Sequence, residues 1–87
     1  MIVFKYPLEL INWQKIDLPV DSKILTAQIR NGKICLWAEV STSKLEPVLI
    51  KIVATGHKDI IEEWDEYIGT VQDADHVLHI YRGQLRR

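Results

Sequence analysis

The sequence predicts a small, mainly β domain of the α+β kind: an antiparallel β-sandwich or barrel of about six strands with one short helix. Three observations lead to this prediction. Asn31-Gly32 separates two apolar-rich runs, short β-branched segments alternate with turn residues, and an acidic segment that begins at Asp59 has the pattern of a helix start. Short strands with regularly spaced turn signals are typical of small sandwiches and barrels.

The first two strands are expected at the N-terminus. "IVFKY" reads as a strand closed by Pro7, and residues 10–18 read as a second strand ended by Pro19. Proline cannot donate a ladder hydrogen bond, so it marks a strand end or an edge.

The strongest local signal is the hairpin turn at Asn31-Gly32. Both central residues of a two-residue type I′ turn need positive φ, which Asn and Gly tolerate best. The predicted register places Arg30 opposite Lys33, Gln28 opposite Cys35, Thr26 opposite Trp37, and Ile24 opposite Glu39. Strand side chains alternate between faces, so one face is apolar: Leu25, Ala27, Ile29, Ile34, Leu36 and Ala38. The other face is polar around one large aromatic ring, Trp37.

The C-terminal half predicts three strands and the helix. Residues 47–54 form a β-branched run long enough for a buried strand, and residues 67–72 and 76–82 form a last hairpin around Asp73-Ala74-Asp75. Asp59 followed by Glu62 resembles a capped helix start. We expect about two turns of helix before Gly69, fastened to the sheet by Ile60, Ile61 and Trp64.

Length, charge and cysteine content narrow the class of protein. The chain has 87 residues, a net charge of −1 and one cysteine, Cys35. This length predicts one small domain, residues 1–87, and a small core favours homo-oligomerisation. No apolar run is long enough for a transmembrane helix and no signal peptide is evident. A lone cysteine fits the reducing cytoplasm.

Six short motifs in order carry a resemblance to a known family. The motifs are Lys5-Tyr6-Pro7-Leu8, Leu18-Pro19, Leu36-Trp37-Ala38, Ala54-Thr55-Gly56-His57, Tyr67-Ile68-Gly69-Thr70 and His79-Ile80-Tyr81. With these motifs the chain resembles a family of small phage and prophage proteins of unknown function. Ala54 departs from the family's Gly-Thr-Gly-His loop at its first glycine, which weakens an anion-binding role there. The resemblance implies a setting, phage–host conflict or phage physiology, rather than a reaction. Small phage proteins commonly bind a host protein or a nucleotide signal, so we expect a binding protein that interferes with host defence in the host cytoplasm.

The residue pattern argues against catalysis and against a metal site. His76 and His79 are three apart on a strand, so they point to opposite faces and do not converge as zinc ligands do. Cys35 has no nearby base that would activate a thiol, and the acids of residues 59–66 are expected to face solvent. We therefore expect neither an enzyme nor a cofactor.

Two stretches are candidate binding sites. Thr55-Gly56-His57 before a helix start could cradle a phosphate, although the acids that follow would repel it. Trp37 with Gln28, Arg30 and Lys33 could stack a base and hold a phosphate, or form a protein interface. The predicted ligand-binding residues are Trp37, Gln28, Arg30, Thr55, His57 and Arg82, and the predicted ligand is a small nucleotide-like signal. The alternative is a protein that binds a host or phage protein, either as a protein–protein inhibitor that uses residues 59–67 or as a structural interaction module. Membrane binding and specific nucleic-acid binding are not expected.

Overall fold

The computed structural model describes residues 1–56, 58 and 61–85, and in these residues it contains strands but no helix. The seven strands are β1 (Ile2–Pro7), β2 (Trp13–Pro19), β3 (Lys23–Arg30), β4 (Lys33–Val40), β5 (Leu45–Ala54), β6 (Glu66–Asp73) and β7 (His76–Arg82). All strand pairs are antiparallel. They form a three-stranded sheet in the order β1-β4-β3 and a four-stranded sheet in the order β2-β5-β7-β6.

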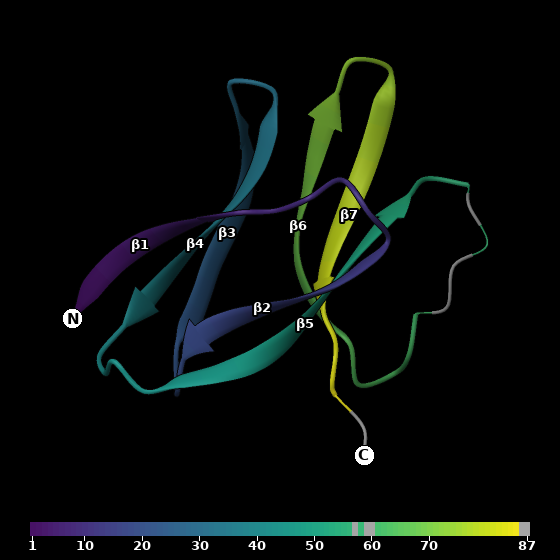
Figure 1. Ribbon diagram of the computed structural model, residues 1–87. Helices are drawn as coiled ribbons and strands as arrows, with labels where there is room; N and C mark the ends of the chain where they lie inside the picture. The colour runs from purple at the N-terminus through teal and green to yellow at the C-terminus, as the bar shows by residue number, and fades with distance from the viewer. Residues whose placement is uncertain (57, 59–60, 86–87) are drawn as a thin grey trace.

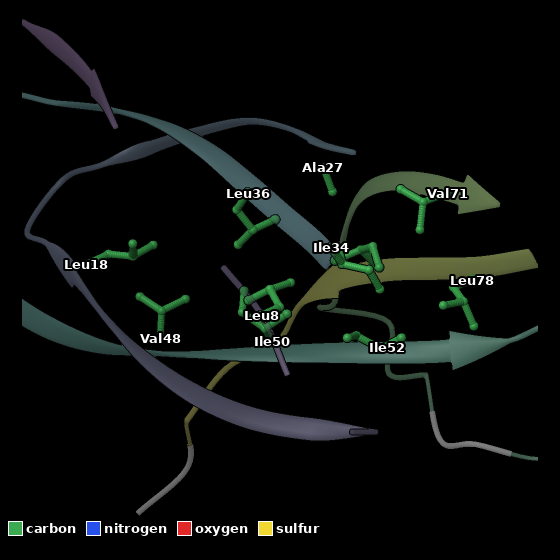
Figure 2. Close-up of a cluster of buried hydrophobic side chains, with 11 residues drawn as sticks. Leu8, Leu18, Ala27, Ile34, Leu36, Val48, Ile50, Ile52, Val71 and Leu78 are labelled. Atoms are coloured by element: carbon green, nitrogen blue, oxygen red, sulfur yellow. The ribbon is translucent and has the colours of Figure 1, made fainter. Parts of the chain in front are cut away.

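The two sheets enclose one apolar core (Figures 1 and 2). Leu36 from β4 and Ile50 from β5 are fully buried, and Leu8 in the β1–β2 connection closes the space between the sheets. The backbone N–H of Leu8 donates to Ile34 O at 2.9 Å, which fixes this connection to β4. The β3–β4 and β6–β7 turns lie at the same end of the sandwich. No helix long and apolar enough to cross a membrane occurs in the part of the chain that the structure describes.

The hairpin prediction at Asn31-Gly32 is confirmed. The two residues have φ of 51° and 77°, which are the left-handed values that a type I′ turn needs. Arg30 lies opposite Lys33, Gln28 opposite Cys35 and Thr26 opposite Trp37, as the turn geometry predicts. The strands closed by Pro7 and Pro19, the long strand β5 and the last hairpin β6–β7 are also found, although β2 begins at Trp13 and not at residue 10.

The register predicted beyond Thr26 is wrong because β3 carries a bulge at Leu25. Ile24, not Leu25, lies opposite Ala38 and packs on the core, whereas Leu25 is 43% exposed. Strand β6 has a matching irregularity at Ile68. Leu25 and Ile68 line one depression where β3 and β6 bring the two sheets into contact. Bulges bend strands, and here they lie where the sheets approach each other.

The predicted helix over residues 59–66 is wrong in its described part. Glu63 and Trp64 form a turn and β6 begins at Glu66; Asp59 and Ile60 lie outside the described residues. The Asp65 carboxylate accepts the Glu62 N–H at 2.8 Å, and the Asp65 N–H donates to Glu62 O at 3.1 Å. A side chain that bonds nearby backbone groups competes with helix formation. Ile61 and Trp64 remain 41% and 37% exposed, so they do not form the buried apolar face that would hold a helix against the sheet.

Candidate functional site

The outer surface of the three-stranded sheet brings together three of the predicted ligand-binding residues. Trp37 lies at its centre on β4, between Lys5 of β1 and Thr26 of β3. Gln28 and Arg30 follow on β3 and are exposed, while Trp37 is half-buried. We call this surface the Trp37 face. It comprises Lys5, Lys23, Thr26, Gln28, Arg30, Lys33, Trp37 and Glu39.

The charges on the Trp37 face are mostly positive and mostly unpaired. Lys23 lies opposite Glu39, which is a favourable cross-strand arrangement, but Arg30 lies directly opposite Lys33. Like charges that face each other across a strand pair destabilise a sheet. Within the described residues, Lys5, Arg30 and Lys33 form no ion pair. These three cations are therefore available to an anionic ligand.

The remaining predicted residues lie elsewhere. Thr55 follows β5 in the four-stranded sheet, and His57 lies outside the described residues. Arg82 lies opposite the fully buried Ile50, on the inner side of that sheet, and its guanidinium is 3.7 Å from the Glu46 carboxylate. The six predicted residues thus do not form one site.

Arg82 borders a surface groove of about 580 Å³. Trp64 lines the groove as well, together with three acids: Asp21, Glu46 and Glu66. Three carboxylates against one guanidinium make this groove a poor site for phosphate, because like charges repel the ligand.

The outer surface of the four-stranded sheet carries a chain of hydrogen-bonded side chains, which we call the His79 cluster: Thr55, Tyr67, Thr70 and His79. His79 Nε2 is 2.7 Å from Thr55 Oγ1, and His79 Nδ1 is 3.1 Å from Thr70 Oγ1. The Tyr67 hydroxyl bonds Thr70 Oγ1 in turn. Three motifs from separate parts of the sequence therefore meet here, at the end of β5, on β6 and on β7.

The His79 cluster already satisfies its own polar groups. Both ring nitrogens of His79 have hydroxyl partners, and Thr55 Oγ1 also lies 3.3 Å from Val77 O. The Tyr67 ring meets Tyr81 edge to face, with centroids 5.6 Å apart. In the described part of the chain no group of three His, Cys, Asp or Glu side chains could hold a metal ion. The cluster is therefore best interpreted as a set of hydrogen bonds that links β5, β7 and β6 and stabilises their pairing.

A buried ion pair lies beside this cluster on the same surface. Lys51 Nζ is 2.7 Å from Asp65 Oδ2, and the two side chains are only 3% and 0% exposed. The Trp13 ring covers the ammonium, with its centroid 5.0 Å from Nζ. Buried ions need partners because desolvation penalises each charge alone. The pair therefore holds the segment before β6 against the sheet.

Gly83 makes room for this arrangement. A Cβ at this position would lie 2.9 Å from Leu49 Cδ2 and 3.3 Å from Asp65 Oδ1. Any side chain here would push against the carboxylate that Lys51 needs. A side chain at residue 83 would therefore have to displace neighbouring side chains, and the Gly83 backbone N–H continues the sheet by donating to Leu49 O at 2.9 Å.

The chain matches a known protein family over its whole length. Residues 1–87 match the model of a family described as "Domain of unknown function (DUF7352)". The chain belongs to this family. No curated protein and no solved structure matches the chain. Membership in DUF7352 brings no activity with it, so the phage and prophage setting stays a prediction.

Within this DUF7352 chain, sequence reasoning missed Lys51, Asp65 and Trp13. The sequence does hold a sign that Lys51 has a partner. Lys51 is the one charged residue inside the apolar run "VLIKIVA", and a charge in a buried strand needs a partner. Asp65 carries no comparable signal, because it is one of seven acids between residues 59 and 75. Only the fold selects which of them reaches Lys51.

Proposed function

We propose that the protein is a non-catalytic binding protein whose Trp37 face holds an anionic, nucleotide-like ligand. The observation that carries this proposal is the cross-strand pair of Arg30 and Lys33 on the same face as Trp37. An anion between two opposed cations relieves their repulsion, and charge-assisted hydrogen bonds to phosphate are the stronger kind.

The spacing on the face suits a ligand longer than a single nucleotide. Trp37 offers a half-buried ring on which a base can stack. Lys33 is four residues away on the same strand, a separation of about 13 Å at ~3.3 Å per residue. Gln28 lies between these two positions in the register and can hydrogen-bond a base edge. A dinucleotide with a base on Trp37 and a phosphate at Arg30 and Lys33 fits this arrangement.

The biological setting of the proposal rests on the resemblance to small phage and prophage proteins. In that setting the protein sequesters a nucleotide signal in the host cytoplasm and thereby interferes with host defence. The proposal assigns no catalytic residue and no cofactor. Thr55 and Arg82 are not part of the Trp37 face, and a role for His57 stays a prediction.

A ligand panel tests the proposal directly. Thermal unfolding is followed with mononucleotides, cyclic dinucleotides and short linear oligonucleotides, since a ligand that binds only the folded state raises the melting temperature by mass action. We expect a dinucleotide to stabilise the protein, and we expect Trp37→Ala and the double change Arg30→Ala with Lys33→Ala to remove that stabilisation.

Lys44→Ala is the matched control, because Lys44 is exposed but lies in the β4–β5 connection, away from the face. If no member of the panel shifts the melting temperature at roughly 100-fold above micromolar affinity, the nucleotide proposal fails. Equal binding by the Lys44 variant and the double variant would remove the Trp37 face as the site.

A protein–protein inhibitor is the second candidate, and one observation favours it. Trp64 and Tyr67 are 37% and 59% exposed, and they are interleaved with the acids Glu63 and Glu66. Aromatic residues are frequent hot spots of protein interfaces. A pull-down from host lysate that recovers one stoichiometric partner, and that fails with Trp64→Ala, would favour this function over nucleotide binding.

A further inference from the structure

Strand β1 is an open edge of the three-stranded sheet. Among the described residues it pairs only with β4, so the backbone groups on its other side have no strand partner. Natural edge strands are usually blunted by charges, prolines, bulges or a short length. In β1 the charge of Lys5 and the terminal Pro7 are the only such features along six residues.

The inward side of β1 is also uncovered. Ile2 and Phe4 lie opposite Val40 and Ala38, which are buried, so these two side chains are on the core-facing side. They are nevertheless 59% and 48% exposed. With Met1 and Leu45, which are 88% and 59% exposed, they line a groove of about 430 Å³ at the open side of the sandwich. The core-facing side of β1 is therefore left partly uncovered.

We propose that a second copy of the chain covers this edge by antiparallel pairing of β1 with β1 of the partner subunit, so that the exposed side chains of the two strands lie beside each other. The two-fold axis passes at Phe4, which places Phe4 opposite Phe4 of the partner subunit and Ile2 opposite Tyr6 of the partner subunit. The two three-stranded sheets then form one six-stranded sheet. Two-fold symmetry is the commonest symmetry of homo-oligomers.

The sequence of β1 is complementary to itself in this register. Lys5 lies opposite Val3 of the partner subunit, so no like charges oppose each other. An axis one residue later, at Lys5, would place two lysines face to face, which is destabilising. An axis one residue earlier, at Val3, would pair fewer residues. The self-complementary register is the reason to favour a second copy over an unrelated partner strand.

A stable dimer buries a sizeable area on each partner. A standard interface removes about 800 Å² from each partner, which is about an eighth of the 6122 Å² surface of this chain. The free edge of β1 and the exposed apolar side chains of Met1, Ile2, Phe4 and Leu45 would contribute to such an interface. The dimer would also place two Trp37 faces on one continuous sheet, but the inference does not rest on the proposed ligand.

Light scattering after size-exclusion chromatography measures the assembly. We expect twice the 10.1 kDa mass of one chain at micromolar concentration. Phe4→Lys should give a monomer, since two added lysines would face each other across the axis. Leu10→Lys should stay dimeric, because Leu10 is 65% exposed in the β1–β2 connection, outside β1. A monomeric wild type would overturn the proposal.

Cysteine cross-linking tests the register and does not depend on how well the lysine variant folds. Residues directly opposite in an antiparallel pair have Cα atoms about 4.5–5.5 Å apart, which is within the range of a disulfide. Phe4→Cys should therefore form a disulfide-linked dimer under mild oxidation, at least tenfold faster than Leu10→Cys. Ile2→Cys should not, since it faces Tyr6 of the partner subunit. Equal rates for all three variants would exclude the proposed pairing, whether or not the protein binds nucleotides.

Discussion

The outer surfaces of the two sheets use their cations in opposite ways. On the four-stranded sheet, Lys51 is buried, paired with Asp65 and covered by Trp13. On the three-stranded sheet, Arg30 and Lys33 are exposed and face each other without a described acid partner. The first arrangement stabilises the fold, and the second works slightly against it. A charged side chain that does not stabilise the fold is the better candidate for binding a ligand.

Removal of Asp65 gives the largest expected effect on this comparison. Asp65→Ala leaves Lys51 buried without its carboxylate, and breaking one side of a buried pair costs about 3–5 kcal/mol. Small domains have only about 5–15 kcal/mol of stability in total, so this variant should be largely unfolded under mild stress. Urea denaturation followed by circular dichroism measures the loss.

Glu63→Ala is the control for Asp65→Ala, because it removes the same charge from an exposed position two residues away. We expect it to change the free energy of unfolding by less than about 0.5 kcal/mol. Replacement of both partners, by Lys51→Met with Asp65→Leu, should recover stability relative to Asp65→Ala alone. Comparable losses for Asp65→Ala and Glu63→Ala would show that the buried pair does not hold the segment before β6.

The contacts of Asp65 also explain why the hairpin could be predicted from the sequence and the structure of residues 61–66 could not. The Asn31-Gly32 hairpin could be predicted because both of its determinants, positive φ and strand alternation, are local. The helix at residues 59–66 was predicted from equally local signals, but Asp65 is held by Lys51, fourteen residues earlier in the chain. A contact between distant residues decides this segment, and no local pattern contains that information.

The candidate site, too, could be predicted from the sequence only where local signals determine it. Trp37, Gln28 and Arg30 could be placed on one surface because the hairpin register fixes them. Thr55 and Arg82 could not be placed, since the sides of β5 and β7 on which they lie depend on how the two sheets pack. The bulge at Leu25 is another such case: it arises where β3 meets β6, a strand of the other sheet.

The His79 cluster gives the second test, with an intermediate effect. Thr70→Val keeps the shape of the side chain but removes the hydroxyl between Tyr67 and His79. A hydrogen bond contributes about 0.5–1.5 kcal/mol net, and the exposure of Thr70 favours the lower end of that range. Thr26→Val is the control on the other sheet, because the Thr26 hydroxyl makes only a 3.5 Å contact with Ala27 O. If both changes lower the free energy of unfolding equally, the hydrogen bonds of the His79 cluster do not stabilise the sheet.

The smallest expected change in stability comes from Arg30→Ala. Comparison with a cation of the four-stranded sheet tests whether Arg30 contributes to the stability of the fold. Removal of Arg30 relieves its repulsion from Lys33 and breaks no ion pair in the described chain, so we expect a change within about 0.5 kcal/mol. Arg82→Ala is the counterpart on the other sheet, where the guanidinium is 3.7 Å from Glu46; we expect a loss of up to about 1 kcal/mol. Chemical denaturation of both variants in low salt measures the difference. A loss for Arg30→Ala larger than that for Arg82→Ala would mean that Arg30 stabilises the fold, and the argument that its charge is free for a ligand would fail.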